Sequence, residues 1–336
     1  MSVAETKKRL QSKKNIIDGH THVGISQKFY RQNGYPYALS YEDLVIRMKL
    51  LNIDYSVVFP FVDSDFYKGE TTDSKIKTTT KYCQFPYESE NRNLLIEINE
   101  IFTDYRSKSL PFLMFDPSRE AEKQAAFMEE LSEQYAVFGL KTATTYIQAF
   151  VNDLETKGKA IVDFVRKKNL PILFHSSVHP SDPWASVYDI IGFAERNPDI
   201  RVCVAHSARF SKPALEKAAR LPNCFVDLSA FTIHCELARQ NSPAIAQDDI
   251  RFKADYNRPT KVIAALIDTY PDTIIWGSDT PFYYWIQKYY TADGVLTEDR
   301  LRCGYDEEKN LLDTLPQDLK YKIAYGNTMQ FLFGGE

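Results

Sequence analysis

Short apolar runs alternate with longer amphipathic segments along most of this chain. Eight runs predict buried β-strands, and they cover residues 15–24, 55–61, 110–115, 136–142, 170–175, 200–206, 224–229 and 273–278. The segments between them carry apolar residues at the spacing of amphipathic helices, and they cover 40–51, 88–106, 118–134, 154–168, 184–196, 211–220 and 260–270. Continuous apolar strands separated by helices are typical of parallel sheets buried on both faces.

This alternation predicts an α/β fold, a (β/α)8 TIM barrel with its site at the C-terminal face of the strands. An open doubly wound sheet is the alternative, but the chain has neither G-x-G-x-x-G nor G-x-x-x-x-G-K to support it. We expect a single barrel domain over 15–336, preceded by an N-terminal lead-in, 1–14, and ended by C-terminal helices on either side of Pro316. A polar, threonine-rich stretch at about 62–90 predicts an insertion.

The composition excludes several classes of function. Of the 336 residues 44% are hydrophobic and 26% are charged, and the net charge is −4, which argues against a nucleic-acid or anionic-membrane partner. No run approaches the roughly 18 apolar residues of a membrane span. The five cysteines show no pairing pattern and residues 1–14 lack the apolar stretch of a secretory signal, which predicts a soluble cytoplasmic protein. We expect a small-molecule substrate. The sequence leaves open whether the protein forms a homo-oligomer.

Side chains with metal-binding chemistry directly follow the predicted strands. His20 and His22 end the first strand and point to the same face, because alternate residues of a strand do so. His175, His206 and Asp279 follow the fifth, sixth and eighth strands. The C-terminal ends of barrel strands converge at one mouth, so these groups predict a divalent-metal site. Imidazole with carboxylate suits Zn²⁺ best, with Mn²⁺ or Fe²⁺ as alternatives.

Several motifs resemble those of one enzyme superfamily. They are Ile17-Asp18-Gly19-His20-Thr21-His22, Gly139-Leu140-Lys141, Phe174-His175, Ala205-His206-Ser207, Phe225-Val226-Asp227-Leu228-Ser229, Trp276-Gly277-Ser278-Asp279-Thr280-Pro281-Phe282 and Tyr325-Gly326-Asn327-Thr328. In these motifs, which span nearly the whole chain, it resembles the amidohydrolase superfamily. Within that superfamily it is similar to the amidohydrolase-related branch that includes aminocarboxymuconate-semialdehyde decarboxylase.

The resemblance implies a ligand set and a proton-transfer group. The residues implied to bind one metal ion, with water completing its shell, are His20, His22, His175 and Asp279. His206 is then a hydrogen-bond partner of that water and acts as general base or as the acid for the leaving group. Asp279 is a second candidate for accepting the proton. The remaining histidines, His179 and His234, lie in predicted loops, and we expect neither to be a ligand.

Four further residues are predicted to bind substrate. Lys141 ends the fourth strand; in some superfamily members a lysine here is carbamylated and bridges two metals, but the amidohydrolase-related branch is mononuclear. Whether Lys141 is carbamylated stays open; as a free ammonium it would bind a carboxylate or polarise a carbonyl. A barrel-interior lysine paired with a neighbouring acid is the alternative. Arg209, on the rim beyond strand six, is expected to bind an anionic group. Trp184 and Tyr283 lie in the loops after strands five and eight and are expected to wall the pocket.

Two reactions share these residues. One is hydrolysis of an amide, ester or lactone bond in a small substrate, with or without a carboxylate, by metal-activated water. The other is metal-dependent non-oxidative decarboxylation on the same site. A non-catalytic binding protein with a vestigial site is an alternative of another class, which the complete ligand set disfavours. The loops at 25–39, 62–90, 176–184 and 230–258 show no pattern that identifies the substrate.

Overall fold

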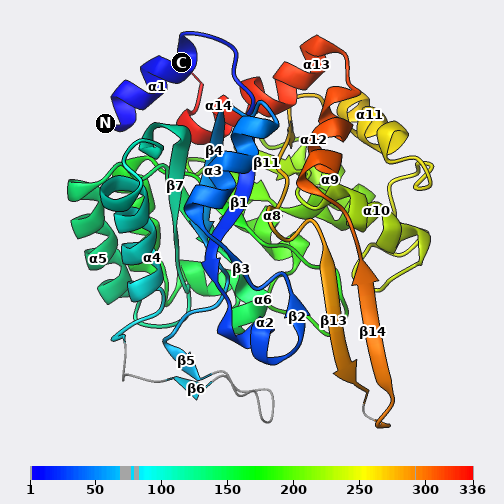
Figure 1. Ribbon diagram of the computed structural model, residues 1–336, viewed down its shortest axis with the longest axis horizontal. Helices are drawn as coiled ribbons and strands as arrows, with labels where there is room; N and C mark the ends of the chain where they lie inside the picture. The colour runs from blue at the N-terminus through cyan, green and yellow to red at the C-terminus, as the bar shows by residue number, and fades with distance from the viewer. Residues whose placement is uncertain (1, 69–76, 79–82, 292, 336) are drawn as a thin grey trace.

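Eight parallel strands form the centre of the molecule (Figure 1). The computed structural model describes residues 2–335 except 69–76, 79–82 and 292. The eight strands are β1 (Ile17–Ile25), β4 (Tyr55–Pro60), β7 (Ser109–Met114), β8 (Gly139–Thr142), β9 (Ile172–Phe174), β10 (Val202–Val204), β11 (Cys224–Asp227) and β12 (Ile274–Ile275). Each pairs with the next in chain order, and all these pairings are parallel.

The sheet closes on itself between its first strand and its last. The backbone N–H of Gly19 in β1 donates to the carbonyl of Trp276, just after β12, at 3.0 Å. The N–H of Asp279 donates to the carbonyl of His20 at 2.9 Å. This closure confirms the predicted (β/α)8 barrel and excludes the open doubly wound sheet.

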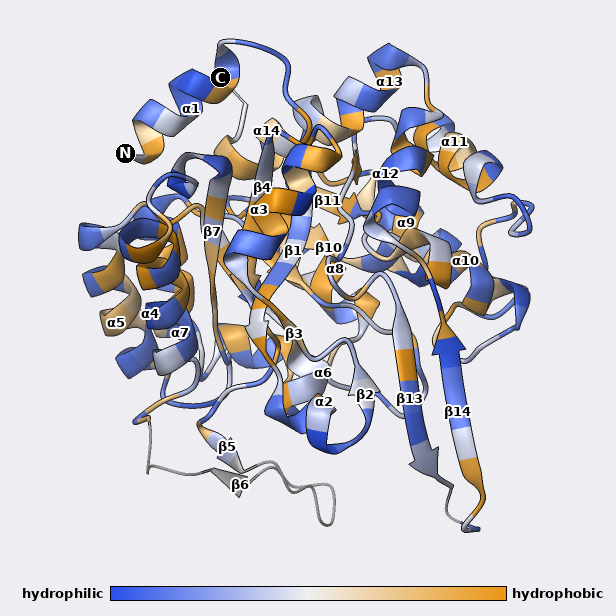
Figure 2. Ribbon diagram, viewed as in Figure 1, coloured by the Kyte–Doolittle hydropathy of each residue, from blue (hydrophilic) through white to orange (hydrophobic). Residues whose placement is uncertain are grey.

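Helices surround the barrel between consecutive strands. The outer layer contains α3 (Tyr41–Leu50), α4 (Glu88–Ile96), α5 (Ala121–Gln134), α7 (Lys159–Lys168), α8 (Val187–Arg196), α9 (Lys212–Ala218) and α11 (Pro259–Thr269). Figure 2 shows that these helices turn apolar faces toward the sheet and polar faces outward, as their sequence spacing predicts. The Ser40 hydroxyl begins α3 by accepting a hydrogen bond from the Asp43 N–H.

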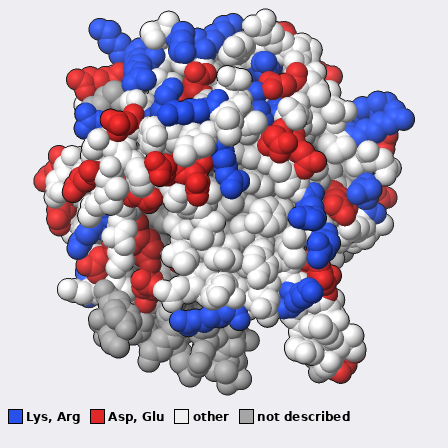
Figure 3. All heavy atoms as spheres, in the orientation of Figure 1, with Lys and Arg blue, Asp and Glu red and all other residues white. Residues whose placement is uncertain are grey.

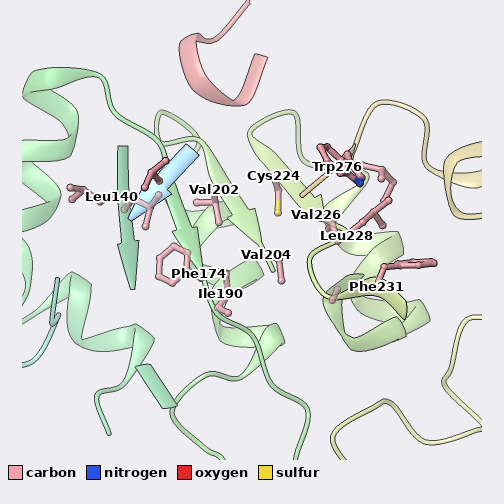
Figure 4. Packing of buried hydrophobic residues seen from close by; sticks show 14 of the residues in the cluster. Leu140, Phe174, Ile190, Val202, Val204, Cys224, Val226, Leu228, Phe231 and Trp276 are labelled. Atoms are coloured by element: carbon pink, nitrogen blue, oxygen red, sulfur yellow. The ribbon is translucent and has the colours of Figure 1, made fainter. Parts of the chain in front are cut away.

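Alternate residues of each strand pack on opposite faces of the sheet. In β4, Val57 and Phe59 join the cluster inside the barrel, whereas Val58 joins the outer cluster. Figure 4 shows part of the outer cluster, in which Val202 and Val204 of β10 pack beneath α8. Both faces are therefore buried, which explains why the strand sequences are continuously apolar.

The two ends of the barrel differ in what covers them. The N-terminal helix α1 (Val3–Gln11) and the C-terminal helices α12 (Tyr305–Asp313), α13 (Gln317–Tyr321) and α14 (Asn327–Phe333) lie toward one end (Figure 1). There Phe331 of α14 contacts Phe112 of β7, with ring centroids 6.1 Å apart. The C-terminal ends of the strands face the opposite end, where side chains from many strands meet.

Shorter elements surround that opposite end. They are α2 (Gln27–Arg31), α6 (Thr144–Ile147), α10 (Phe231–Arg239), the short strands β2 (Gly34–Tyr35) and β3 (Ala38–Leu39), and the hairpins β5 (Tyr67–Lys68) with β6 (Lys77–Thr78) and β13 (Trp285–Tyr290) with β14 (Leu296–Leu301). Segment 25–39, expected as a loop, therefore holds a helix and two strands, and segment 230–258 begins with α10. The insertion expected at about 62–90 lies partly outside the described residues.

The molecular surface mixes the two signs of charge. On the face shown in Figure 3, lysine and arginine are interspersed with aspartate and glutamate, and no continuous basic stripe is visible. In the part of the chain that the structure describes, every helix is too short or too polar to span a bilayer.

Candidate metal centre

Three side chains that could bind a metal ion come from opposite ends of the chain and meet at the mouth of the barrel. His20 Nε2 lies 3.2 Å and His22 Nε2 lies 3.3 Å from Asp279 Oδ1. Their potential ligand atoms all lie within 4.8 Å of one another. The three residues are only 1%, 2% and 5% exposed. Strand β1 supplies the two imidazoles, and the segment after β12 supplies the carboxylate.

The hydrogen bonds around the two imidazoles orient their lone pairs toward this point. Among the described residues, the close partners of Nδ1 are acceptors, the Asp227 carboxylate at 2.8 Å for His20 and the Pro60 carbonyl at 3.0 Å for His22. In a neutral imidazole Nδ1 then carries the hydrogen, and Nε2 presents a lone pair. In this form the two imidazole lone pairs and the carboxylate oxygen face one point, which is the arrangement that a bound cation takes. The donor set therefore fits a divalent metal ion.

Burial and charge act on the protonation of this group in opposite ways. Burial lowers the pKa of His22 to about 4 and favours the neutral ligand form. Burial would raise the pKa of Asp279, but the neighbouring His20 and His22 hold it well below its usual value. Burial and Lys141 both oppose the charged form of His20, yet Asp227 and Asp279 together raise the pKa of His20.

Lys141 extends from β8 into the same cluster. Its ammonium nitrogen lies 3.5 Å from His20 Nε2 and 5.2 Å from the centre of the Phe59 ring, and the residue is 1% exposed. Burial lowers the pKa of this lysine to about 8. The lysine predicted at the mouth therefore lies beside the group formed by His20, His22 and Asp279.

His206 and His175 form a second pair next to this group. His206 Nε2 lies 2.9 Å from His175 Nδ1, and His206 Nδ1 lies 3.7 Å from Asp279 Oδ2. The other nitrogen of His175, Nε2, lies 3.1 Å from a guanidinium nitrogen of Arg209. Both ring nitrogens of His175 thus have partners, and among the described residues the group with metal-binding geometry contains His20, His22 and Asp279 without it. His175 as a fourth ligand stays a prediction.

Arg209 is buried at the mouth in contact with histidines. It is 8% exposed, its Nε donates to the Ser176 carbonyl at 2.6 Å, and its Nη1 lies 2.6 Å from Nε2 of His234. Burial lowers the pKa of Arg209 to about 10. Burial likewise lowers the pKa of His234 to about 3.

An unusual backbone turn carries Arg209 to this place. Five consecutive residues, 206–210, have φ between +47° and +61°, which is one turn of left-handed helix. Each such residue costs about 1–2 kcal/mol when it is not glycine, and the sequence His-Ser-Ala-Arg-Phe contains no glycine. Strain of this kind persists only where the surroundings enforce it, and it concentrates at functional sites.

The described contacts of the two remaining predicted site residues, Tyr283 and Trp184, do not include the histidines of the mouth. Tyr283 accepts a hydrogen bond from Arg47 at 3.0 Å and stacks on Tyr305, with ring centroids 6.0 Å apart. Trp184 lies partly exposed in the loop before α8. Several rings contact the histidines of the mouth: Phe59 lies 4.5 Å and Phe282 5.0 Å from the His22 ring, and Tyr146 of α6 lies 5.5 Å from the His175 ring. Tyr146 also lines a pocket of about 290 Å³ beside the ends of β1 and β4.

Sequence reasoning missed the roles of Asp227 and His234. Asp227 ends β11 in a quoted motif, and its position at a strand end was the available signal. Besides His20, it accepts a hydrogen bond from the His206 N–H at 2.9 Å, so it ties two histidines together. His234 lay in a stretch expected to be a loop, although Phe231, Cys235 and Ala238 have helical spacing and share the buried face of α10.

Comparisons with known proteins relate residues 104–334 to one family and nearly the whole chain to one fold. A family model described as amidohydrolase matches residues 104–334. An amidohydrolase from Burkholderia multivorans is 15% identical with a TM-score of 0.59, over 96% of this chain and 100% of that one. No curated protein sequence matches the chain.

Two further solved structures are enzymes of different reaction types. A 5-carboxyvanillate decarboxylase from Novosphingobium aromaticivorans, complexed with manganese and 4-hydroxy-3-methoxy-5-nitrobenzoic acid, is 10% identical with a TM-score of 0.56, over 96% of this chain and 97% of that one. A dihydroorotase from Campylobacter jejuni is 13% identical with a TM-score of 0.51, over 94% and 81%. At these identities the likeness shows the fold alone.

Proposed function

Because this chain belongs to the amidohydrolase family, we propose that it is a metal-dependent hydrolase that cleaves an amide, ester or lactone bond in a small molecule. The observation that carries the proposal is the convergence of two imidazole lone pairs and one carboxylate oxygen at a buried point. Within the family we place the chain in the amidohydrolase-related branch that includes aminocarboxymuconate-semialdehyde decarboxylase, on the motifs around His20 and Asp279.

His20, His22 and Asp279 would hold one Zn²⁺, with Mn²⁺ or Fe²⁺ as alternatives. A bound divalent ion of this kind polarises a carbonyl oxygen and lowers the pKa of water. We assign acceptance of the proton from the attacking water to Asp279, and its delivery to the leaving group to His206, whose Nδ1 lies 3.7 Å from Asp279 Oδ2.

Two buried cations would hold the substrate. Lys141 lies 3.5 Å from His20 Nε2, in a position to polarise a carbonyl beside the metal-binding group. Arg209 lies one imidazole ring further out, beyond His175. The pocket next to Tyr146 offers space for the rest of a small molecule.

Metal content and turnover in matched histidine variants test this proposal. Purified protein reconstituted with zinc is expected to hold about one equivalent, measured by mass spectrometry of the metal. His20→Ala and Asp279→Ala are expected to lose both the metal and the hydrolysis of a panel of amides, esters and lactones. His179→Ala is the control, because this residue's ring contacts Ser181 and not the cluster. Metal binding and turnover that survive His20→Ala would refute the proposal.

Decarboxylation is a second candidate that one observation favours. Lys141 and Arg209 are two buried cations at the same mouth, and such a pair suits a substrate that carries a carboxylate near a second oxygen. The two reactions differ in their products. Release of CO₂ from a panel of aromatic and unsaturated carboxylic acids, without hydrolysis of any ester or amide, would replace the hydrolase assignment with a decarboxylase.

A further inference from the structure

The hydrogen bonds of Arg209 leave its charge without a counter-ion. A guanidinium has five N–H donors, and the described acceptors of Arg209 are the Ser176 carbonyl and the rings of His234 and His175. Among the described residues, no carboxylate lies within ion-pair distance of this arginine. A buried charge is most stable when an opposite charge pairs with it. At the mouth of the barrel, an anion from outside the chain can supply that partner.

His234, which accepts a hydrogen bond from Arg209, is an uncharged imidazole, as its two hydrogen bonds show. Its Nδ1 lies 2.7 Å from the Ala230 carbonyl, which can only accept, so Nδ1 carries a hydrogen. Its Nε2 lies 2.6 Å from Nη1 of Arg209, which can only donate, so Nε2 carries the lone pair. The ring therefore fixes the direction of the guanidinium and contributes no negative charge. An aspartate or glutamate in the same place would fix the direction and cancel the charge.

A chain of hydrogen bonds runs from Arg209 through His175 to His206, beside the metal-binding group. His175 accepts from Nη2 of Arg209 at 3.1 Å and so can donate from Nδ1 to His206 Nε2, 2.9 Å away. An anion on Arg209 would thus lie two imidazole rings from Asp279. The left-handed turn at 206–210 places both His206 and Arg209 at the mouth.

We propose that the substrate carries a carboxylate, that Arg209 binds this carboxylate, and that His234 is a positioning residue that orients Arg209 and preserves its positive charge. The inference deepens the proposed function and rests on it for the assumption that the mouth of the barrel receives a substrate. It assigns a role to His234, which the sequence placed in a loop, and it narrows the substrate to anionic molecules.

Equilibrium binding of benzoate and of its uncharged counterpart benzamide tests the proposal. Calorimetry on the wild-type protein, as purified and after chelation, is expected to show benzoate binding about 10- to 100-fold more tightly than benzamide, the range for a charge-assisted hydrogen-bonded pair. Arg209→Met is expected to abolish this preference. Equal binding of the two probes to the wild-type protein would overturn the proposal.

Two substitutions of His234 separate orientation from charge. His234→Gln offers a neutral acceptor and is expected to keep the preference for benzoate, whereas His234→Glu pairs with Arg209 and is expected to lose it. A merely structural role would make the two variants behave alike, and that result would overturn the role of His234. Circular dichroism verifies folding, and if His234→Glu does not fold, the same comparison is made with His234→Phe, which lacks the acceptor and is expected to lose the preference.

This test is independent of the reaction that the protein catalyses. Probe binding after chelation needs neither metal nor turnover, so an absent benzoate preference is a failure of this inference alone. Loss of metal binding or hydrolysis with an intact preference would be a failure of the proposed function alone.

Discussion

The imidazole of His20 is fixed on both sides, because Nδ1 meets Asp227 at 2.8 Å and Nε2 faces Asp279 at 3.2 Å. Partners of this kind hold the tautomer and ring orientation of a metal ligand, and their loss typically costs 10- to 100-fold in metal affinity. We predict a loss of about that size for Asp227→Asn, measured by competition with a chelator. Asp199→Asn, on the surface beside Arg166, is the control and is expected to change nothing.

Glu308 of α12 predicts a pH dependence of stability. It is 1% exposed, and burial raises its pKa from 4.5 to about 7. Below pH 4.5 the carboxyl is protonated in both the folded and the unfolded chain. Between about 4.5 and 7 the unfolded chain ionises first, so the free energy of unfolding falls as pH rises, by about 3 kcal/mol in total.

Glu308→Gln removes this group from the titration. The free energy of unfolding in urea, measured at pH 5 and at pH 8, is expected to fall less in the variant than in the wild-type protein. Comparison of the two proteins cancels the other titrating groups. Parallel pH profiles would show that Glu308 ionises normally in the folded state.

At the scale of residues, the sequence predicted side chains that stand at the ends of apolar runs. His20, His22 and Asp279 were found in this way because strand direction alone places them at the mouth. Asp227 and His234 were assigned no role, because each acts on a side chain from a different element, and no local pattern indicates such a pairing.

The left-handed turn at 206–210 makes an element-scale prediction. Ala208 is fully buried with φ +47°, so glycine there relieves the left-handed strain and offsets the loss of the methyl group. Ala208→Gly is expected to change the free energy of unfolding by less than about 0.5 kcal/mol. Ala194→Gly, in the right-handed helix α8, is the matched control and is expected to cost about 1 kcal/mol. Equal losses in chemical denaturation would contradict the assigned strain.

Elements determined by the apolar pattern of their own residues were predictable from the sequence. Elements determined by contacts with residues distant in the sequence were not. The strands and the helices between them follow from continuous or periodic apolar patterns, as in β4 and α8. The turn at 206–210 uses residues that normally avoid positive φ, so no sequence signal marks it. The hairpin of β13 and β14 was missed because β13 is partly exposed and pairs with the distant short strand β2.

At the scale of the whole molecule, the first and last strands of the barrel approach each other closely. A Cβ on Gly277 would lie 2.8 Å from Cβ of His20, closer than real Cβ contacts. Gly277→Ala is therefore expected to cost about 1–3 kcal/mol and to weaken metal binding, because the shift falls on a ligand residue. Gly326→Ala is the control, since its nearest neighbour would be 3.9 Å away.

Thermal unfolding and metal titration of the two glycine variants measure this effect. A Gly277→Ala protein with wild-type melting temperature and metal affinity would show that the joint between β1 and β12 accommodates a methyl group. The barrel itself was predictable because eight alternations are a whole-chain pattern. The close approach of Gly277 to His20 was not predictable, because the two residues are 257 positions apart in the printed sequence.

The contact between the first and last strands also has a consequence for the order of steps during biosynthesis. His20 and His22 are synthesised before Asp279, which follows His20 by 259 positions in the sequence. A nascent polypeptide can therefore offer two imidazoles to a passing cation but not the complete set of donors. Under the proposed function, full capture of a metal ion requires that the last strand has docked against the first.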